Sequence, residues 1–425
     1  MPLASAARAA PVLSDRRWPL ICSVLSVAVG CAVWFGWGPL VLHRAAWLTP
    51  GDMWSTFRAA HWVAWGDFGG VYASGTQLVS FPGLLLLLAP MAALTGSLGL
   101  SENLPFTLAH PGAWVLLGPY EVLLGSLSLF AFDALAQRLG VGTRRRAMLC
   151  LTEAVILFNV TALWGHPEDA VALGLAAYAL TFAFDRRWAG AGWLFGAAVA
   201  VQPLVLLMLP VLASVFGGRR VPGLLVRAAA PALALLSVPL VEEFRATSHA
   251  LVDQPNFPNV DHATPWTALA PRLAGHGHSL AVAGGPGRVL AVLLACAIGV
   301  RARHWRHRPD LLVWGAALAM AGRCFTESVM DPYYIWPALA LALVAAAAAP
   351  NALPLLLTGF LAAAGTVYAD FHLSLWAWWL PVMGAIVAVL STSLPMYRMD
   401  LAVRRTPRPP TRFPGTPGSL AGAAR

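Results

Sequence analysis

Apolar runs long enough, or nearly long enough, to cross a lipid bilayer recur along the whole chain. Of its 425 residues, 58% are hydrophobic and 11% are charged, which is more apolar surface than one water-soluble core can bury. A bilayer core needs about 20 consecutive apolar residues per helix, so we predict an all-α polytopic membrane protein with about 11–13 transmembrane helices. The runs lie at about 19–42, 81–98, 113–134, 147–164, 169–185, 189–216, 223–241, 287–300, 310–328, 334–349, 353–369 and 374–395.

The basic residues fall in short clusters between these runs, and none of them is a lysine. Cytoplasmic loops of membrane proteins are enriched in arginine, so the net charge of +9 indicates membrane topology and not a nucleic-acid partner. We predict a cytoplasmic N-terminus over 1–18, a transmembrane domain over 19–397 and a disordered cytoplasmic tail over 398–425. The clusters lie at 138–146, 186–187, 219–227, 301–308 and 404–412.

Three polar segments should then lie outside: a loop at about 45–80, the turn "WGHPED" and a loop at about 242–287. Two runs disturb this alternation. Two apolar runs separate the first outer loop from the arginines at 138–146, where an odd number of crossings is needed, and the run 189–216 has arginines at both ends. A broken or re-entrant helix in "FPGLLLLLAP" or in "VQPLVLLMLP" would remove each conflict, because proline frees a backbone carbonyl.

Several kinds of chemistry are not indicated by the sequence. The five cysteines lie within apolar runs without metal-like spacing, and there is no glycine-rich phosphate loop. Without lysine, no Schiff-base mechanism is available. We therefore expect no metal site and no cofactor, with a divalent cation as an open alternative.

The stretch "GDMWSTFRAAHWVAWGDF" opens the first outer loop and places Trp54, Arg58, His61 and Trp65 at helical spacing. This pattern predicts a short interfacial helix, with Asp52 as its N-cap and with Arg58 and His61 facing lipid phosphates. The same residues suit catalysis as well. A carboxylate at this position could deprotonate a hydroxyl while the cations hold a phosphate leaving group.

Two further motifs carry polar residues at apolar helix ends. "WGHPEDA" contains His166, Glu168 and Asp169, and its proline and acids favour helix initiation. "MDPYYIWP" repeats this capping pattern with Asp331, followed by Tyr333 and Tyr334, which suit an aromatic belt. Acids at the edge of a membrane are also candidates for function.

Arg323 lies inside an apolar run, in "AMAGRCFTES". A guanidinium within a membrane needs a partner. Glu327, four residues later, or a bound phosphate could supply it.

The order of these motifs resembles the GT-C glycosyltransferases, most closely the actinobacterial branch that uses polyprenyl-phosphate mannose. The resemblance runs over about 19–350 through "GDMWSTFRAAHWVAWGDFGGVYAS", "FPGLLLLLAPMAAL", "LWGHPEDAVALGLAAYALTF", "AGAGWLFGAAVAVQPLVLLMLPVL" and "DPYYIWPALAL". It implies an inverting mannosyltransferase of the plasma membrane, with an extracytoplasmic active site, a polyprenyl-phosphate sugar donor and a glycolipid or cell-envelope glycan acceptor.

The resemblance also assigns residues to roles. It implies that Asp52 is the general base and that "DFGGVY", through Tyr72, closes the first outer loop. Tyr72 and the other matched positions would bind the donor's phosphate or sugar: Arg58, His61, Tyr72, His166, Glu168, Asp169, Gln202, Arg323, Asp331, Tyr333 and Tyr334. The chain departs from the family at Gln202, where a lysine often precedes the proline. A transporter or flippase of lipid-linked intermediates, or a catalytically silent protein of the same fold, remain alternatives.

Overall fold

The structure is a computed structural model that describes residues 16–37, 51–72, 78, 80–100, 112–254, 256–258, 261–273 and 280–395. For residues 34, 36, 37, 51, 52 and 253 it describes the backbone alone. The predicted tail 398–425, and the N-terminal segment before residue 16, lie outside the described residues.

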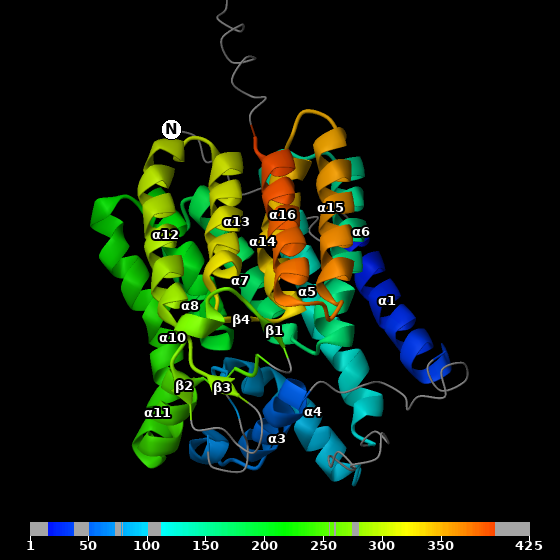
Figure 1. Cartoon of the computed structure of the whole chain (residues 1–425), viewed down its shortest axis with the longest axis vertical. Coiled ribbons are helices and arrows are strands. Elements are labelled where there is room, and N and C mark those ends of the chain that lie inside the picture. Colours follow the sequence, from blue (N-terminus) through cyan, green and yellow to red (C-terminus); the bar gives the residue numbers. More distant parts are fainter. Residues whose placement is uncertain are drawn as a thin grey trace, which may run out of the picture. The chain divides into compact units, whose positions relative to one another are not determined.

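Helices make up almost all of the described chain, and the described part of each predicted apolar run is mainly helical (Figure 1). The all-α prediction is therefore confirmed. Four helical segments are long and apolar enough to cross a membrane, and shorter apolar helices accompany them. The helices are α1 (Arg17–Cys31), α3 (Gly51–Ala64), α4 (Gly83–Ser97), α5 (Trp114–Arg138), α6 (Thr143–Phe158), α7 (Pro167–Phe184), α8 (Trp188–Val201), α9 (Leu209–Phe216), α10 (Val221–Glu242), α11 (Phe244–Asp253), α12 (Pro286–Ala302), α13 (Pro309–Thr326), α14 (Trp336–Ala347), α15 (Leu353–Ala369) and α16 (Leu375–Ser393).

The arginine clusters meet at one end of the helical bundle, which we call the arginine end. Their hydrogen bonds join the ends of helices that are far apart in sequence, as the positive-inside pattern predicts. These bonds run from Arg138 to Asp185, from Arg145 to Ala347, from Arg306 to Ser214 and from Arg308 to Pro395.

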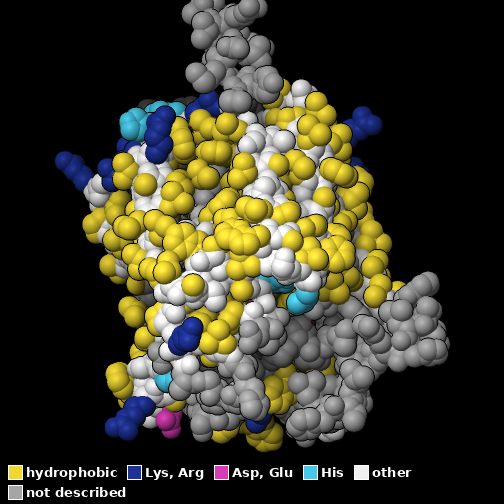
Figure 2. Space-filling model, in the orientation of Figure 1, with side chains coloured by type: hydrophobic (Ala, Val, Ile, Leu, Met, Phe, Trp, Pro, Cys, Tyr) yellow, Lys and Arg dark blue, Asp and Glu magenta, His cyan; other side chains and the backbone are white. Residues whose placement is uncertain are grey.

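We call the opposite end the outer end. Most of the helices run between the two ends, whereas α3, α4 and α11 lie at the outer end (Figure 1). α14 is the central helix, because all of its residues are buried. Hydrophobic side chains cover the band between the ends on the face seen in Figure 2, as expected of a surface in contact with lipid.

The run 189–216 is a helical hairpin with a break at its outer end. α8 ends at Val201, Gln202 is extended (φ −147°, ψ 110°), and the 3-10 helix η4 (Pro203–Met208) leads into α9. Trp188 and Phe216, at the two ends of the hairpin, lie 5.0 Å apart at the arginine end. The predicted break in "VQPLVLLMLP" is confirmed, and it explains why arginines flank both ends of this run.

The run 81–98 does not contain the predicted break. α4 is continuous from Gly83 to Ser97 with Pro90 inside it, so its helix is not broken. A Cβ on Gly83 would lie 2.3 Å from the carbonyl oxygen of Ala200, and one on Gly96 would lie 3.9 Å from the His61 ring. Both ends of α4 are therefore at the outer end, beside α3 (Figure 1), and the parity conflict disappears because α4 does not cross the bundle.

Short strands complete the outer end. β1 (His262–Ala263) pairs with β4 (Val329–Met330), and β2 (Arg272–Leu273) pairs with β3 (Ala281–Val282), both antiparallel. The first pair connects the long outer loop to the end of α13. The outer loop is thereby fixed to the helical bundle.

A buried ion pair anchors the arginine end. The carboxylate of Asp133, in the last part of α5, is fully buried and accepts from Arg146 of α6 at 2.7 and 2.6 Å. Arg16, just before α1, binds the same carboxylate. At the same end, Asp185 pairs with Arg138, but both of these side chains are 40% exposed.

Truncating these two aspartates should lower the free energy of unfolding by very different amounts. Asp133→Ala should lower the free energy of unfolding by about 3–5 kcal/mol, because it leaves buried guanidinium charge uncompensated. Asp185→Ala should cost about 0–1 kcal/mol, because water screens the exposed pair. Thermal unfolding of the purified variants in detergent measures the difference, and equal losses would show that burial is not the deciding factor.

Candidate functional site

Polar side chains from four separate segments converge at the outer end. They come from the start of α7, the break between α8 and η4, the end of α13 and the 3-10 turn η8 (Pro332–Ile335) before α14. These segments contain the sequence-predicted residues at 166–169, 202, 323 and 331–334. The structure thus brings together residues that the sequence identified one motif at a time.

His166 and Glu168 form the first contact of this group. Gly165 takes a positive φ of 64°, and the turn places His166 at the N-cap position, ahead of Pro167 at the first helical position. The imidazole Nδ1 lies 2.7 Å from Glu168 Oε1. The imidazole ring also stacks on Tyr333, with the ring centroids 3.9 Å apart and the planes at 18°, so "WGHPED" and "DPYY" are in direct contact.

Gln202 contacts the other acid of the α7 start. Its side-chain amide donates to Asp169 Oδ1 at 2.8 Å. Asp169 is buried, so the amide stabilises a carboxylate that has little access to water. The helix break at Gln202 therefore supplies a donor at the position where the GT-C glycosyltransferases, which this sequence resembles, often have lysine.

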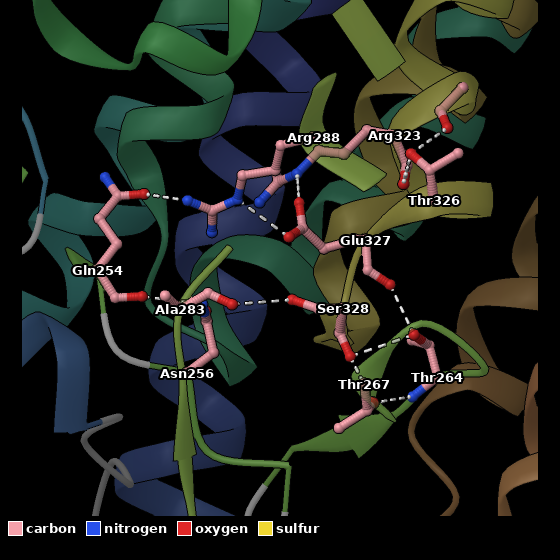
Figure 3. A network of polar contacts seen from close by, with 11 residues as sticks. Gln254, Asn256, Thr264, Thr267, Ala283, Arg288, Arg323, Thr326, Glu327 and Ser328 are labelled. Atoms are coloured by element: carbon pink, nitrogen blue, oxygen red, sulfur yellow. Dashed lines mark hydrogen bonds and ion pairs between the residues drawn. The ribbon is translucent and has the colours of Figure 1, made fainter. Parts of the chain in front are cut away.

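Arg323 and Glu327 form the predicted ion pair, at 2.9 Å between Nε and Oε2. A second arginine, Arg288 in the first turn of α12, donates to Glu327 Oε1 at 3.1 Å and to Gln254 at 2.9 Å. Figure 3 shows both guanidiniums approaching the one carboxylate. The Arg323 guanidinium also lies 3.9 Å from the Tyr334 ring centroid, a cation–π geometry.

Arg288 is not among the residues predicted from the sequence. Its position in the sequence could have identified it. Arginine is unusual at the outer end of a membrane protein, and it is unfavourable in the first turn of a helix, where the macrodipole is positive. Both features call for a compensating anion. Glu327 meets that need.

The backbone just after Arg323 is fixed by the outer loop. Thr264 Oγ1 donates to the carbonyl oxygens of Glu327 at 2.6 Å and Ser328 at 3.1 Å, and Thr267 donates to Ser328 at 2.6 Å (Figure 3). The same threonines line a cavity of about 410 Å³, together with Arg272 and Trp376. The carboxylate that holds both arginines is thus positioned from the loop side as well.

The predicted residues of the first outer loop lie on α3 and the turn after it. The Arg58 guanidinium lies over the Trp54 ring at 4.7 Å, which confirms that these residues share one face of a helix. His61 is buried with its ring edge-on to Phe57 at 4.8 Å, and burial lowers the pKa of its imidazole. Its ring is therefore neutral at pH 7.

Tyr72 and Asp52 complete that loop. The Tyr72 hydroxyl donates to the Ser80 carbonyl at 2.8 Å and so closes the loop, as expected of the "DFGGVY" stretch. α3 begins at Gly51, so Asp52 lies in the first turn and not at the N-cap. The side chain of Asp52 lies outside the described residues.

Asp331 is buried at the N-cap position of η8, and its carbonyl oxygen accepts from the Tyr334 amide at 3.0 Å. The described side chains include no group of three or more His, Cys, Asp or Glu residues that could hold a metal ion. The described chemistry of the outer end is therefore carboxylates, guanidiniums, imidazoles and stacked aromatic rings.

The structure is similar to that of an oligosaccharyltransferase from Archaeoglobus fulgidus in its apo form, with a TM-score of 0.40 and 12% sequence identity. The similarity covers 90% of this chain and 57% of that one. No model of a known protein family matches the sequence, and no curated protein matches it.

Glu327→Gln should destabilise the outer end. The variant leaves Arg288 and Arg323 without their shared carboxylate, so we expect the free energy of unfolding to fall by about 3 kcal/mol. Glu243→Gln is the matched control, because Glu243 is an exposed outer-end residue and its loss should cost less than about 0.5 kcal/mol. Similar melting temperatures for the two variants in detergent would contradict the role given to Glu327.

Proposed function

We propose that this protein is a membrane glycosyltransferase that moves a sugar, mannose in our assignment, from a polyprenyl-phosphate donor to a glycolipid or cell-envelope glycan. The observation that carries the proposal is the convergence of polar segments at the end of the bundle opposite the arginine clusters. Their order along the chain is the order of the GT-C motifs. We assign the site to the extracytoplasmic face of the plasma membrane, because arginine clusters favour the cytoplasm.

The paired arginines suit the leaving phosphate of such a donor. Each guanidinium has five N–H groups in a planar fork, and the contacts to Glu327, and to Gln254 from Arg288, use only some of them. Guanidinium forks match phosphate oxygens in pairs. Arg323 and Arg288 would stabilise the negative charge that the phosphate gains as it leaves.

The reaction needs one base and no protein nucleophile. In our assignment, Asp52 removes the proton of the acceptor hydroxyl, and the acceptor oxygen attacks the sugar C1 opposite the phosphate. The C1–O bond to the phosphate breaks, and the phosphate leaves with the electron pair. One displacement inverts the configuration at C1, and the lipid-linked donor supplies the energy.

A transporter of lipid-linked intermediates is the second candidate, and the break at Gln202 favours it. Transporters use discontinuous helices to form a substrate site near the middle of the membrane. Here the break lies at the outer end, where Gln202 binds Asp169. That position suits a site at the membrane surface better than one at the bilayer midplane.

The transferase proposal predicts different losses for the base and for the phosphate-binding residues. Asp52→Asn should lower transfer from a radiolabelled polyprenyl-phosphate sugar by about 10²–10⁴-fold, and Arg323→Gln should lower it by about 10²–10³-fold. Glu243→Gln should leave transfer unchanged. The experiment measures the amount of radiolabel incorporated into glycolipid or cell-wall polymer by membranes that carry each variant at equal protein level.

Two results would count against this assignment. Undiminished transfer by Asp52→Asn removes Asp52 from the role of base. If wild-type membranes transfer no sugar from any polyprenyl-phosphate donor, but move the intact donor between the leaflets of a vesicle, the transporter candidate replaces the transferase.

A further inference from the structure

Glu121 is a fully buried acid that the proposed reaction does not use. It lies in the apolar stretch "GPYEVLLG" of α5 and is 0% exposed. Neither of its carboxyl oxygens has a hydrogen-bond donor in the part of the chain that the structure describes, and neither does Glu168 Oε2. Buried polar atoms are rarely left unsatisfied, so these oxygens call for an explanation.

The register of α5 against α7 places Glu121 beside the His166 turn. A Cβ on Gly125 would lie 3.5 Å from the Cβ of Ala170, and a Cβ on Gly174 would lie 3.1 Å from the Cα of Ser128. The two helices therefore run parallel at this contact. Four residues before the contact of Gly125 with Ala170, which is one helical turn closer to the outer end, Glu121 lies opposite residue 166.

The charges around Glu121 agree with this register. The charged groups that act on its carboxyl are Glu168 and His166. α5 also packs against α1, α4, α6 and α14, and of these α4 and α14 carry no ionisable side chain. The arginines of α1 and α6 lie at the arginine end with Asp133, and Glu153 of α6 is not among the groups that act on Glu121. The charged groups that face Glu121 therefore come from the start of α7.

An ionised carboxylate in this place would be costly, because it is desolvated and faces a second carboxylate. A neutral carboxyl has an O–H donor, which an ionised one lacks. Glu168 Oε2 is an acceptor that needs a donor. One proton, held on Glu121, meets both needs.

We propose that Glu121 is a neutral acid that donates to Glu168 and thereby positions His166. Glu168 then accepts from Glu121 through one oxygen and from His166 Nδ1 through the other, so the imidazole keeps its proton on Nδ1 and its lone pair on Nε2. Glu121 keeps its proton throughout and makes or breaks no covalent bond. Its effect on the rate of sugar transfer rests on the proposed function, with Glu121 as a positioning residue and not a catalytic one.

The test compares a variant that keeps a donor with one that does not. Glu121→Gln retains N–H donors and neutrality, so its transfer rate and pH profile should match those of wild type. Glu121→Met is apolar and of similar size, and we expect its rate to fall by about 10- to 100-fold.

Glu153 provides the matched control. It is a fully buried glutamate of α6, also without a described donor to its carboxyl oxygens, and no charged group of the described residues acts on it. Glu153→Met should leave the rate and the pH profile unchanged. Loss of transfer in Glu121→Gln as well as in Glu121→Met would overturn the proposal, because it would make Glu121 a titrating group, and so would wild-type behaviour of both.

A second measurement does not depend on activity. Glu121→Met should lower the melting temperature in detergent, and the same substitution in a Glu168→Gln background should lower it much less, since its partner is already changed. Equal shifts in the two backgrounds would overturn the proposal. If wild type transfers no sugar, the proposed function fails, and this cycle still decides whether Glu121 binds Glu168.

Discussion

The outer end of this protein depends on one buried carboxylate, that of Glu327. It accepts from Arg323 on the same turn of chain and from Arg288 on α12, while its own backbone carbonyl accepts from Thr264 of the outer loop. Two guanidiniums held this close together repel each other, and the anion between them offsets that repulsion. The carboxylate thus lets α12, α13 and the outer loop meet, and the candidate site is built where they meet.

The arginine end uses the same solution for a different purpose. Asp133 is as deeply buried as Glu327 and also accepts from two arginines, but both of these arginines lie at the end predicted to be cytoplasmic. There the ion pair joins α1, α5 and α6 and leaves the surface arginines to set topology. The two ends therefore share a charge pattern and differ in what surrounds it: stacked aromatic rings, an imidazole and further acids occur with the pair at the outer end.

Local patterns in the sequence predicted most of the elements but not their partners. Apolar run length predicted the helices, and i, i+4 spacing predicted the pair of Arg323 and Glu327 because both residues lie on one turn. Local patterns did not predict a role for Arg288 or Glu121, because their roles come from contacts with other helices. The same holds for α4, since only its packing beside α3 shows that an apolar run of spanning composition does not cross the bundle.

The absence of lysine bears on how a lipid phosphate would be held. Gln202 occupies the position where the GT-C glycosyltransferases, which this sequence resembles, often have a cation. Its amide donates a hydrogen bond to Asp169. A positive charge is nevertheless present at the outer end, on Arg288 and Arg323. Lysine offers a mobile point charge, whereas a guanidinium held by a carboxylate offers donors in a fixed plane. If the donor phosphate binds these arginines, its orientation is set by the same contacts that hold the fold together, because Glu327 fixes both guanidinium planes before any ligand arrives.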